Sequence, residues 1–264
     1  MKRMILTGML AFGASVAALM AQQPAAPAAP AAPKGPAPKS KGEQEALMAL
    51  QTALQAQNWD NVIAAAEDLN TKYTDSDFKE IATYYEAVAY QEKNDWIKAD
   101  IYGEKVLEIN PKNIQATLLV GELLAKHTRE NDLDKEEKLG KAEKMLNATI
   151  ENVKTGGKPN PQLTDAQWAE QQKYLIAEAE DNLGICALTR KTYDKAVPHF
   201  RAAVENDPQP SYNVQLASVL QSSGKNDEAI AICDKLLADP QLHPAIKQVA
   251  TNVKAAAMQA KGGK

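Results

Sequence analysis

Cysteine is scarce in this sequence of 264 residues, which contains only Cys186 and Cys233. The two cysteines do not form a C-x-x-C motif, so neither a zinc site nor a redox-active dithiol is predicted. A disulfide would require their Cα atoms to lie within about 7 Å of each other. The helical repeat spacing described below places them on helices that are not nearest neighbours. We therefore favour two buried small hydrophobic side chains, with a single disulfide as the alternative.

Patterns for catalysis and metal binding are also missing. The histidines His127, His199 and His243 are scattered, and none has a partner at metal-ligand spacing. Gly156-Gly157 is not followed by the Lys-Ser or Lys-Thr of a phosphate-binding loop, and no G-x-S-x-G motif occurs. Carboxylates are numerous, but they are common on exposed helices. The sequence therefore predicts no catalytic residue, no metal site and no cofactor site, and we expect that the protein is not an enzyme.

A strongly basic surface is absent as well. The chain carries 30 Lys and Arg against 34 Asp and Glu, for a net charge of −4. Removal of an N-terminal segment with Lys2 and Arg3 would make the net charge about −6. The densest charged run, residues 129–144, alternates in sign and predicts a solvated helix face. These features argue against a nucleic-acid partner.

Residues 1–21 have the pattern of an export signal. Lys2 and Arg3 precede an apolar stretch from Met4 to Met20, and small residues including Ala18 and Ala21 lie near its end. Cleavage after either alanine is predicted, and the absence of paired arginines favours the general export route. An uncleaved membrane anchor is the alternative, because the stretch approaches the about 17–25 residues of a spanning helix. We expect a periplasmic or secreted protein that is not tightly inserted in a membrane after cleavage.

Residues 22–42 form a segment rich in proline and alanine. Its six prolines fix the backbone φ angle and remove hydrogen-bond donors, so the alanines are not expected to form a helix. The composition predicts a disordered linker that samples the polyproline II conformation. Such a segment either holds the folded region away from a membrane, wall or partner, or is a tail without a specific role. The folded region is predicted to begin at Glu43 and to extend to about residue 260.

A repeated spacing of small and large residues dominates the folded region. Gly184 and Pro208 have equivalents 97 residues earlier at Ala87 and Pro111, and a further equivalent of Gly184 occurs 33 residues later at Ala217. Spacing near 34 residues, with small residues at fixed points, is typical of stacked helix-turn-helix units. The separation of 97 residues corresponds to two such periods with about 29 additional residues. We place the additional residues in the stretches 126–139 and 155–173.

The spacing predicts an all-α solenoid of about five units and a final capping helix. The third unit has an enlarged turn. A capping-box pattern at Thr164 and Gln167 predicts the start of a long helix near Asp165. The predicted bounds are 43–79, 80–113, 114–153, 165–210 and 211–242 for the units, and 244–259 for the capping helix.

Small residues allow the two helices of one unit to approach closely. We therefore assign one Ala or Gly of each first helix and one Ala of each second helix to these contacts. Large side chains fill the remaining space, and prolines end the second helices. The predicted packing residues are Ala87, Gly121, Gly184 and Ala217 on first helices, Ala99, Ala142, Ala196 and Ala229 on second helices, the large residues Tyr90 and Phe200, and the prolines Pro111 and Pro208.

These residues resemble the tetratricopeptide repeat (TPR) family, whose repeat follows the pattern W-x2-L-G-x2-Y…A-x3-F…P. The resemblance covers about residues 43–259 and implies a right-handed α-α superhelix, that is, a TPR solenoid. The unit at 80–113 departs from the pattern at Gly103, where a large residue is expected. The unit at 165–210 matches the pattern at Leu183, Gly184, Ala196, Phe200 and Pro208.

The resemblance also implies a concave face that is lined by the first helices and binds a protein or peptide. Core packing or ordinary surface is the alternative role for every residue of this face. Some family members clamp a terminal carboxylate with Lys, Arg and Asn, but here the corresponding residues are apolar, acidic or neutral, so that clamp is not predicted. The residues expected on the face are Tyr84, Val88, Gln91, Leu118, Glu122, Ala125, Asp181, Ile185 and Leu188.

The sequence thus predicts a non-catalytic scaffold that is exported to the cell envelope and binds a protein or extended peptide on its concave face. The alternative is a structural or assembly factor in envelope biogenesis that acts through self-association. The expected partner is an unidentified protein or peptide, and no nucleic acid, metal or cofactor is expected.

Overall fold

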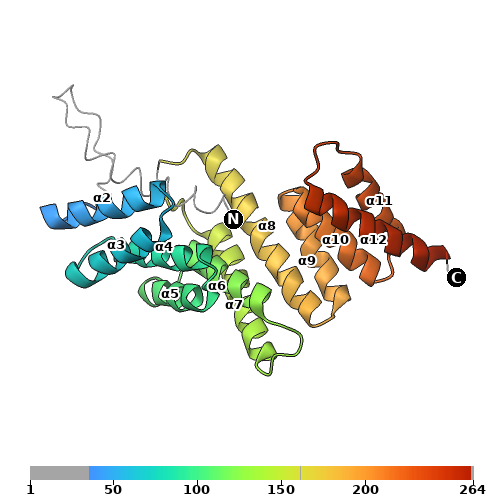
Figure 1. Cartoon of the computed structure of the whole chain (residues 1–264), viewed down its shortest axis with the longest axis horizontal. Helices are drawn as coiled ribbons and strands as arrows, with labels where there is room; N and C mark the ends of the chain where they lie inside the picture. Colours follow the sequence, from blue (N-terminus) through green and yellow to red (C-terminus); the bar gives the residue numbers. More distant parts are fainter. Residues whose placement is uncertain (1–35, 161, 263–264) are drawn as a thin grey trace. The chain divides into compact units, whose positions relative to one another are not determined.

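The computed structural model describes residues 36–160 and 162–262, and all regular secondary structure within them is helical (Figure 1). The predicted export signal at 1–21 and the linker up to residue 35 lie outside the described residues. The predicted all-α architecture is confirmed. The helices are α2 (Lys41–Gln55), α3 (Trp59–Lys72), α4 (Lys79–Glu92), α5 (Trp96–Ile109), α6 (Ile114–His127), α7 (Lys135–Thr155), α8 (Asp165–Thr189), α9 (Tyr193–Asn206), α10 (Pro210–Ser222), α11 (Asn226–Leu237) and α12 (Pro244–Gly262).

The chain divides into two compact units, and the first contains the described residues up to Ala116 together with residues 159, 160 and 162. In this unit α2 packs on α3, α3 on α4, and α4 on α5. Leu47, Leu50 and Leu54 form the buried stripe of α2. Their i, i+3, i+7 spacing places them on one side of the helix, so burial of this stripe holds α2 in the unit.

Helix α2 begins at Lys41, two residues before the predicted start of the folded region. Ser40 caps the helix, because its hydroxyl oxygen accepts a 3.1 Å hydrogen bond from the backbone N–H of Glu43. The Glu43 side chain is buried, and its carboxylate accepts a 2.6 Å hydrogen bond from the hydroxyl of Ser76. The last residues of the segment predicted as linker therefore belong to the first unit.

The second unit contains residues 117–158 and 163–262 of the described chain. Each helix from α7 to α12 packs on the next, and α12 also contacts α10 (Figure 1). The long helix predicted from Asp165 is present as α8, and Thr164 and Gln167 form the predicted capping box. Phe200 is completely buried in a core that α10, α11 and α12 complete.

Glycine and alanine lie where the paired helices come closest. A Cβ atom added to Gly184 would lie 2.8 Å from the Phe200 ring, and one added to Gly121 would lie 2.7 Å from Leu146 Cγ. Both separations are well below the about 3.5–4.0 Å at which carbon atoms pack best. Tyr90 is buried, and Pro111 and Pro208 are exposed shortly before α6 and α10. The completely buried alanines are Ala87, Ala99, Ala142, Ala196, Ala217 and Ala229.

Four helix pairs are joined by the same tight turn. In each turn the residue after the C-cap has a positive φ, and the next residue donates a backbone hydrogen bond to the carbonyl five residues earlier. This is the Schellman arrangement, which ends one helix and allows the next to begin almost at once. The connection from α6 to α7, residues 128–134, has no residue with positive φ. The left-handed residues are Gln57 (φ 51°), Asn94 (φ 60°), Lys191 (φ 58°) and Gly224 (φ 78°).

Cys186 and Cys233 are both buried and form no disulfide. The favoured interpretation of two small buried hydrophobic side chains is confirmed. Burial raises the pKa of the Cys186 thiol to about 12, so the thiolate that reacts with oxidants and metals is not formed near neutral pH.

Candidate binding face

In the first unit, the predicted face of α4 is mostly buried. Tyr84 and Val88 are 5% and 4% exposed, whereas Gln91 is half-buried. The ring of Tyr84 packs against that of Tyr85, with 5.7 Å between the ring centroids. Packing therefore accounts for Tyr84 and Val88 in this structure, and Gln91 is the residue of the three that solvent reaches.

In the second unit, the apolar residues predicted for the face differ between helices. Leu118 and Ala125 on α6 are buried, so they contribute to packing. On α8, Ile185 is half-buried and Leu188 is 37% exposed. These two side chains, one turn apart on α8, form the apolar part of the face that a ligand could contact.

The acidic residues predicted for the face are also buried, which is unusual for ionisable side chains. Glu122 on α6 is 6% exposed and Asp181 on α8 is 4% exposed. With the half-buried Glu178 they form a group that we call the carboxylate cluster. Lys126, one turn after Glu122, places its Nζ 2.6 Å from Glu122 Oε1.

Two residues of α10 donate hydrogen bonds to the cluster. The hydroxyl of Tyr212 donates to Glu178 Oε1 at 2.6 Å. The side-chain amide of Gln215 donates to Asp181 Oδ2 at 3.4 Å. The carboxylate cluster therefore joins α6, α8 and α10, which are the first helices of three consecutive helix pairs.

The electrostatics of the carboxylate cluster favour positive charge. Burial raises the pKa of Asp181 to about 7, Lys126 opposes this shift, and the carboxylates of Glu178 and Glu122 add to it. Burial by itself would lower the pKa of Lys126, but the surrounding carboxylates outweigh burial and raise it. The Lys126 ammonium group thus stays protonated in a region of negative potential.

The carboxylate cluster is not fully satisfied. Glu122 Oε2 and Asp181 Oδ1 are buried and have no hydrogen-bond partner among the described residues. A buried polar atom without a partner costs about 1–3 kcal/mol, and more when it is charged. Natural proteins rarely keep such groups without a structural or functional reason.

Sequence reasoning placed Glu122 and Asp181 on the face but did not connect them with Glu178, Lys126 or Tyr212. The signal that could have done so is the repeat period. Glu178 and its donor Tyr212 are 34 residues apart, and so are Asp181 and Gln215. Residues separated by one period occupy equivalent positions on consecutive first helices, so polar pairs at this separation are expected to meet.

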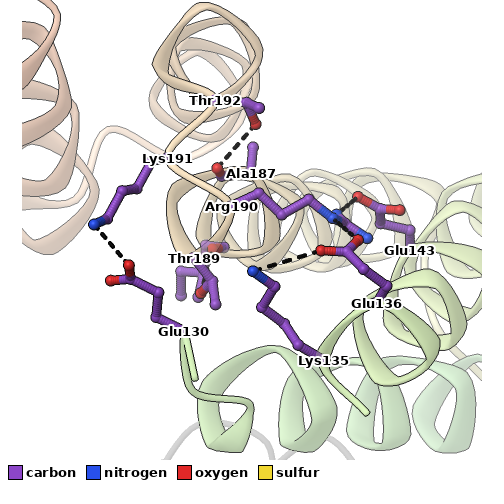
Figure 2. A network of polar contacts seen from close by, with 10 residues as sticks. Glu130, Lys135, Glu136, Glu143, Ala187, Thr189, Arg190, Lys191 and Thr192 are labelled. Carbon is purple, nitrogen blue, oxygen red and sulfur yellow. Dashed lines mark hydrogen bonds and ion pairs between the residues drawn. The ribbon is translucent and has the colours of Figure 1, made fainter. Parts of the chain in front are cut away.

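A second polar network fixes the long connection between α6 and α7 (Figure 2). The guanidinium of Arg190, at the end of α8, donates to Glu136 at 2.7 Å and also to Glu143. Lys191 Nζ lies 2.7 Å from a carboxylate oxygen of Glu130. The hydrogen bond from Arg190 lowers the pKa of Glu136. The Lys191–Glu130 pair attaches the α6–α7 connection to the turn between α8 and α9. The Arg190 hydrogen bonds attach the N-terminal part of α7 to the end of α8.

Within the described ranges, no group of three or more His, Cys, Asp and Glu side chains could hold a metal ion. His199 instead pairs with Glu180, with 2.7 Å between Nδ1 and Oε2. Every helix in the described part of the chain falls short of the length or hydrophobicity that a membrane span requires.

Paired helices, identical tight turns and small residues at the closest contacts define a helical-repeat protein. Two of the solved structures with a similar fold illustrate this. TTC0263, a thermophilic TPR protein from Thermus thermophilus, is 17% identical with a TM-score of 0.53, and the match covers 82% of this chain and 99% of that one. MamA from Desulfovibrio magneticus RS-1 is 16% identical with a TM-score of 0.53, and the match covers 85% and 98%.

No protein-family model matches the chain, and no curated protein matches its sequence. At the identities of the two structures above, the similarity shows the fold. The chain therefore has the TPR fold, as the repeat pattern predicts.

Proposed function

We propose that the protein is a non-catalytic scaffold that is exported to the cell envelope and binds a protein or an extended peptide on its first helices. The observation that carries the proposal is the set of groups on α8. Ile185 and Leu188 expose apolar surface, and the unsatisfied carboxylate of Asp181 lies on the same helix. Apolar surface beside a few fixed polar groups is typical of a recognition site.

Selection from a random peptide library with the purified protein tests this proposal. Leu188→Asp should weaken the binding of the selected peptides by about tenfold, because it places a charge in the apolar part of the face. Met258→Asp is the matched control: this methionine is 55% exposed on α12, which is not a first helix. Equal binding by the two variants, or the absence of any selected peptide, would contradict the proposal.

Export is proposed from residues 1–21 and is tested by mass spectrometry of the protein from its native cells. A mature chain that begins at Leu19 or Gln22 and fractionates with the envelope supports export by the general route. A chain that retains Lys2 and Arg3 in the cytoplasmic fraction would contradict it.

Self-association in envelope assembly is the second candidate, and exposed apolar residues of α5 favour it. Ile97 and Ile101 are 58% and 47% exposed and lie one turn apart. If copies associate through this surface, light scattering will show a concentration-dependent oligomer that Ile97→Lys abolishes. A protein that stays monomeric at high concentration would exclude this role.

A further inference from the structure

The carboxylate cluster has more negative charge than its own donors neutralise. Glu122, Glu178 and Asp181 contribute three carboxylates, and Lys126 contributes one ammonium group. Tyr212 and Gln215 donate hydrogen bonds without adding charge. When all three carboxylates are ionised, the cluster therefore retains two uncompensated negative charges.

The two unpartnered oxygens lie on different helices of this same cluster. Glu122 Oε2 belongs to α6 and Asp181 Oδ1 to α8, and both side chains are more than nine-tenths buried. Neither oxygen is used by Lys126, Tyr212 or Gln215, which bind other carboxylate oxygens. A donor that reached both oxygens would remove two unfavourable buried atoms at once.

Solvent reaches residues at the edge of the cluster. The Lys126 side chain is 42% exposed, and Glu178 and Gln215 are half-buried. A long, flexible side chain with a charged end can therefore approach the cluster beside Lys126. A charged donor forms hydrogen bonds about twice as strong as a neutral one. Guanidinium and ammonium groups present several N–H donors and no acceptor, which suits an environment of carboxylates.

We propose that the carboxylate cluster binds one basic side chain, arginine or lysine, of the protein or peptide that occupies the first helices. Glu122 Oε2 and Asp181 Oδ1 accept hydrogen bonds from the incoming cation, and the apolar surface of Ile185 and Leu188 contacts residues next to it. This inference rests on the proposed function and specifies the chemistry of the partner.

The first test compares the peptide library selected by the wild-type protein with that selected by Glu122→Gln. The wild type should enrich Arg or Lys at one position, and the enrichment should be lost with Glu122→Gln. Glu151→Gln, an exposed glutamate of α7 outside the cluster, should leave the enrichment unchanged. Selected peptides without a basic residue would overturn this inference and leave the proposed function intact. Failure to select any peptide would overturn both.

The second test needs no change in the protein, so it is independent of whether a variant folds. Replacing the basic residue of a selected peptide by neutral citrulline should weaken binding by about tenfold or more. The same replacement should have little further effect on binding to Glu122→Gln. Equal affinities of the two peptides for the wild-type protein would overturn the inference.

A third readout is the pH dependence of affinity. A bound cation favours the ionised form of Asp181, in a site that Glu122 and Lys126 of α6, Glu178 of α8 and Tyr212 of α10 also face. Binding of the basic peptide should therefore tighten between about pH 6 and pH 8. Asp181→Asn should remove this dependence, provided that circular dichroism shows it folded. A wild-type affinity that is flat over this range would contradict the role of Asp181.

Discussion

The regular helix pairs and the enlarged connection between α6 and α7 are held together by different forces. At a regular pair, a small residue such as Gly184 admits a large ring such as Phe200, and a backbone turn closes the pair. The α6–α7 connection instead uses ion pairs of exposed residues, such as Lys191 with Glu130. Apolar packing is not screened by salt, whereas exposed ion pairs are screened and weak. Stability should therefore reside in the regular pairs, while the connection can change at little cost.

The largest expected difference in stability is between substitutions at Phe200 and at Leu133. Phe200→Ala should lower the free energy of unfolding by about 3–5 kcal/mol, because it leaves a cavity in a completely buried core. Leu133→Ala should change it by less than about 0.5 kcal/mol, since Leu133 is fully exposed in the α6–α7 connection. Urea denaturation of the two variants measures both values. Similar losses would show that the connection is part of the core.

Two glycine substitutions should change the stability of the protein in opposite directions. Gly184→Ala should destabilise the protein by about 1–3 kcal/mol, because the new Cβ would meet the buried Phe200 ring at 2.8 Å. Gly140→Ala in α7 should stabilise it by about 0.5–1 kcal/mol, because nothing lies within 4 Å of the new Cβ and alanine favours helix. Thermal unfolding compares them directly. Stabilisation by Gly184→Ala would contradict the close contact between α8 and α9.

A substitution can stabilise a regular turn whose left-handed residue is not glycine. Gln57 has a φ of 51°, which strains any residue with a Cβ atom. Gln57→Gly should therefore raise the free energy of unfolding by about 0.5–1 kcal/mol. The control Gln57→Ala keeps the Cβ atom and should give no gain. If both variants lose stability, the turn does not have the proposed backbone conformation.

The smallest effect on global stability is expected at the ion pairs of the connection. Arg190→Gln should cost less than about 1 kcal/mol, but it should increase hydrogen exchange in residues 128–140 because Glu136 and Glu143 lose their partner. High salt should produce a similar increase in the wild type. The lowered pKa of Glu136 determines how the stabilisation by the Arg190–Glu136 ion pair depends on pH. Its contribution is present at neutral pH and is lost as the pH falls through the acidic range. Unchanged exchange would show that packing alone fixes the connection.

The regular part of the fold could be predicted from the sequence because local sequence features determine it. Small residues one period apart, such as Gly184 and Ala217, mark where helices touch, and the Thr164 capping box marks where α8 begins. The left-handed turns at Gln57 and Lys191 were not predicted, since neither residue type favours a positive φ. Their conformation is imposed by the helices on either side.

The candidate site could be predicted from the sequence only in part. A repeat alignment gives the direction in which a residue points, but not how deeply its neighbours bury it, so Leu118 and Ala125 were placed on a face that packing occupies. The alignment did place Glu122 and Asp181 correctly on first helices. Their missing hydrogen-bond partners are a property of the assembled structure, because they depend on which donors α10 supplies.

The most direct test of the central claim, that ligands bind on the first helices, is a hydrogen-exchange footprint of a selected peptide on the purified protein. We predict slower exchange in α6, α8 and α10 when the peptide is bound, with little change in α7, α9 and α11. Protection centred on α7, α9 and α11, with α6, α8 and α10 unchanged, would contradict the claim.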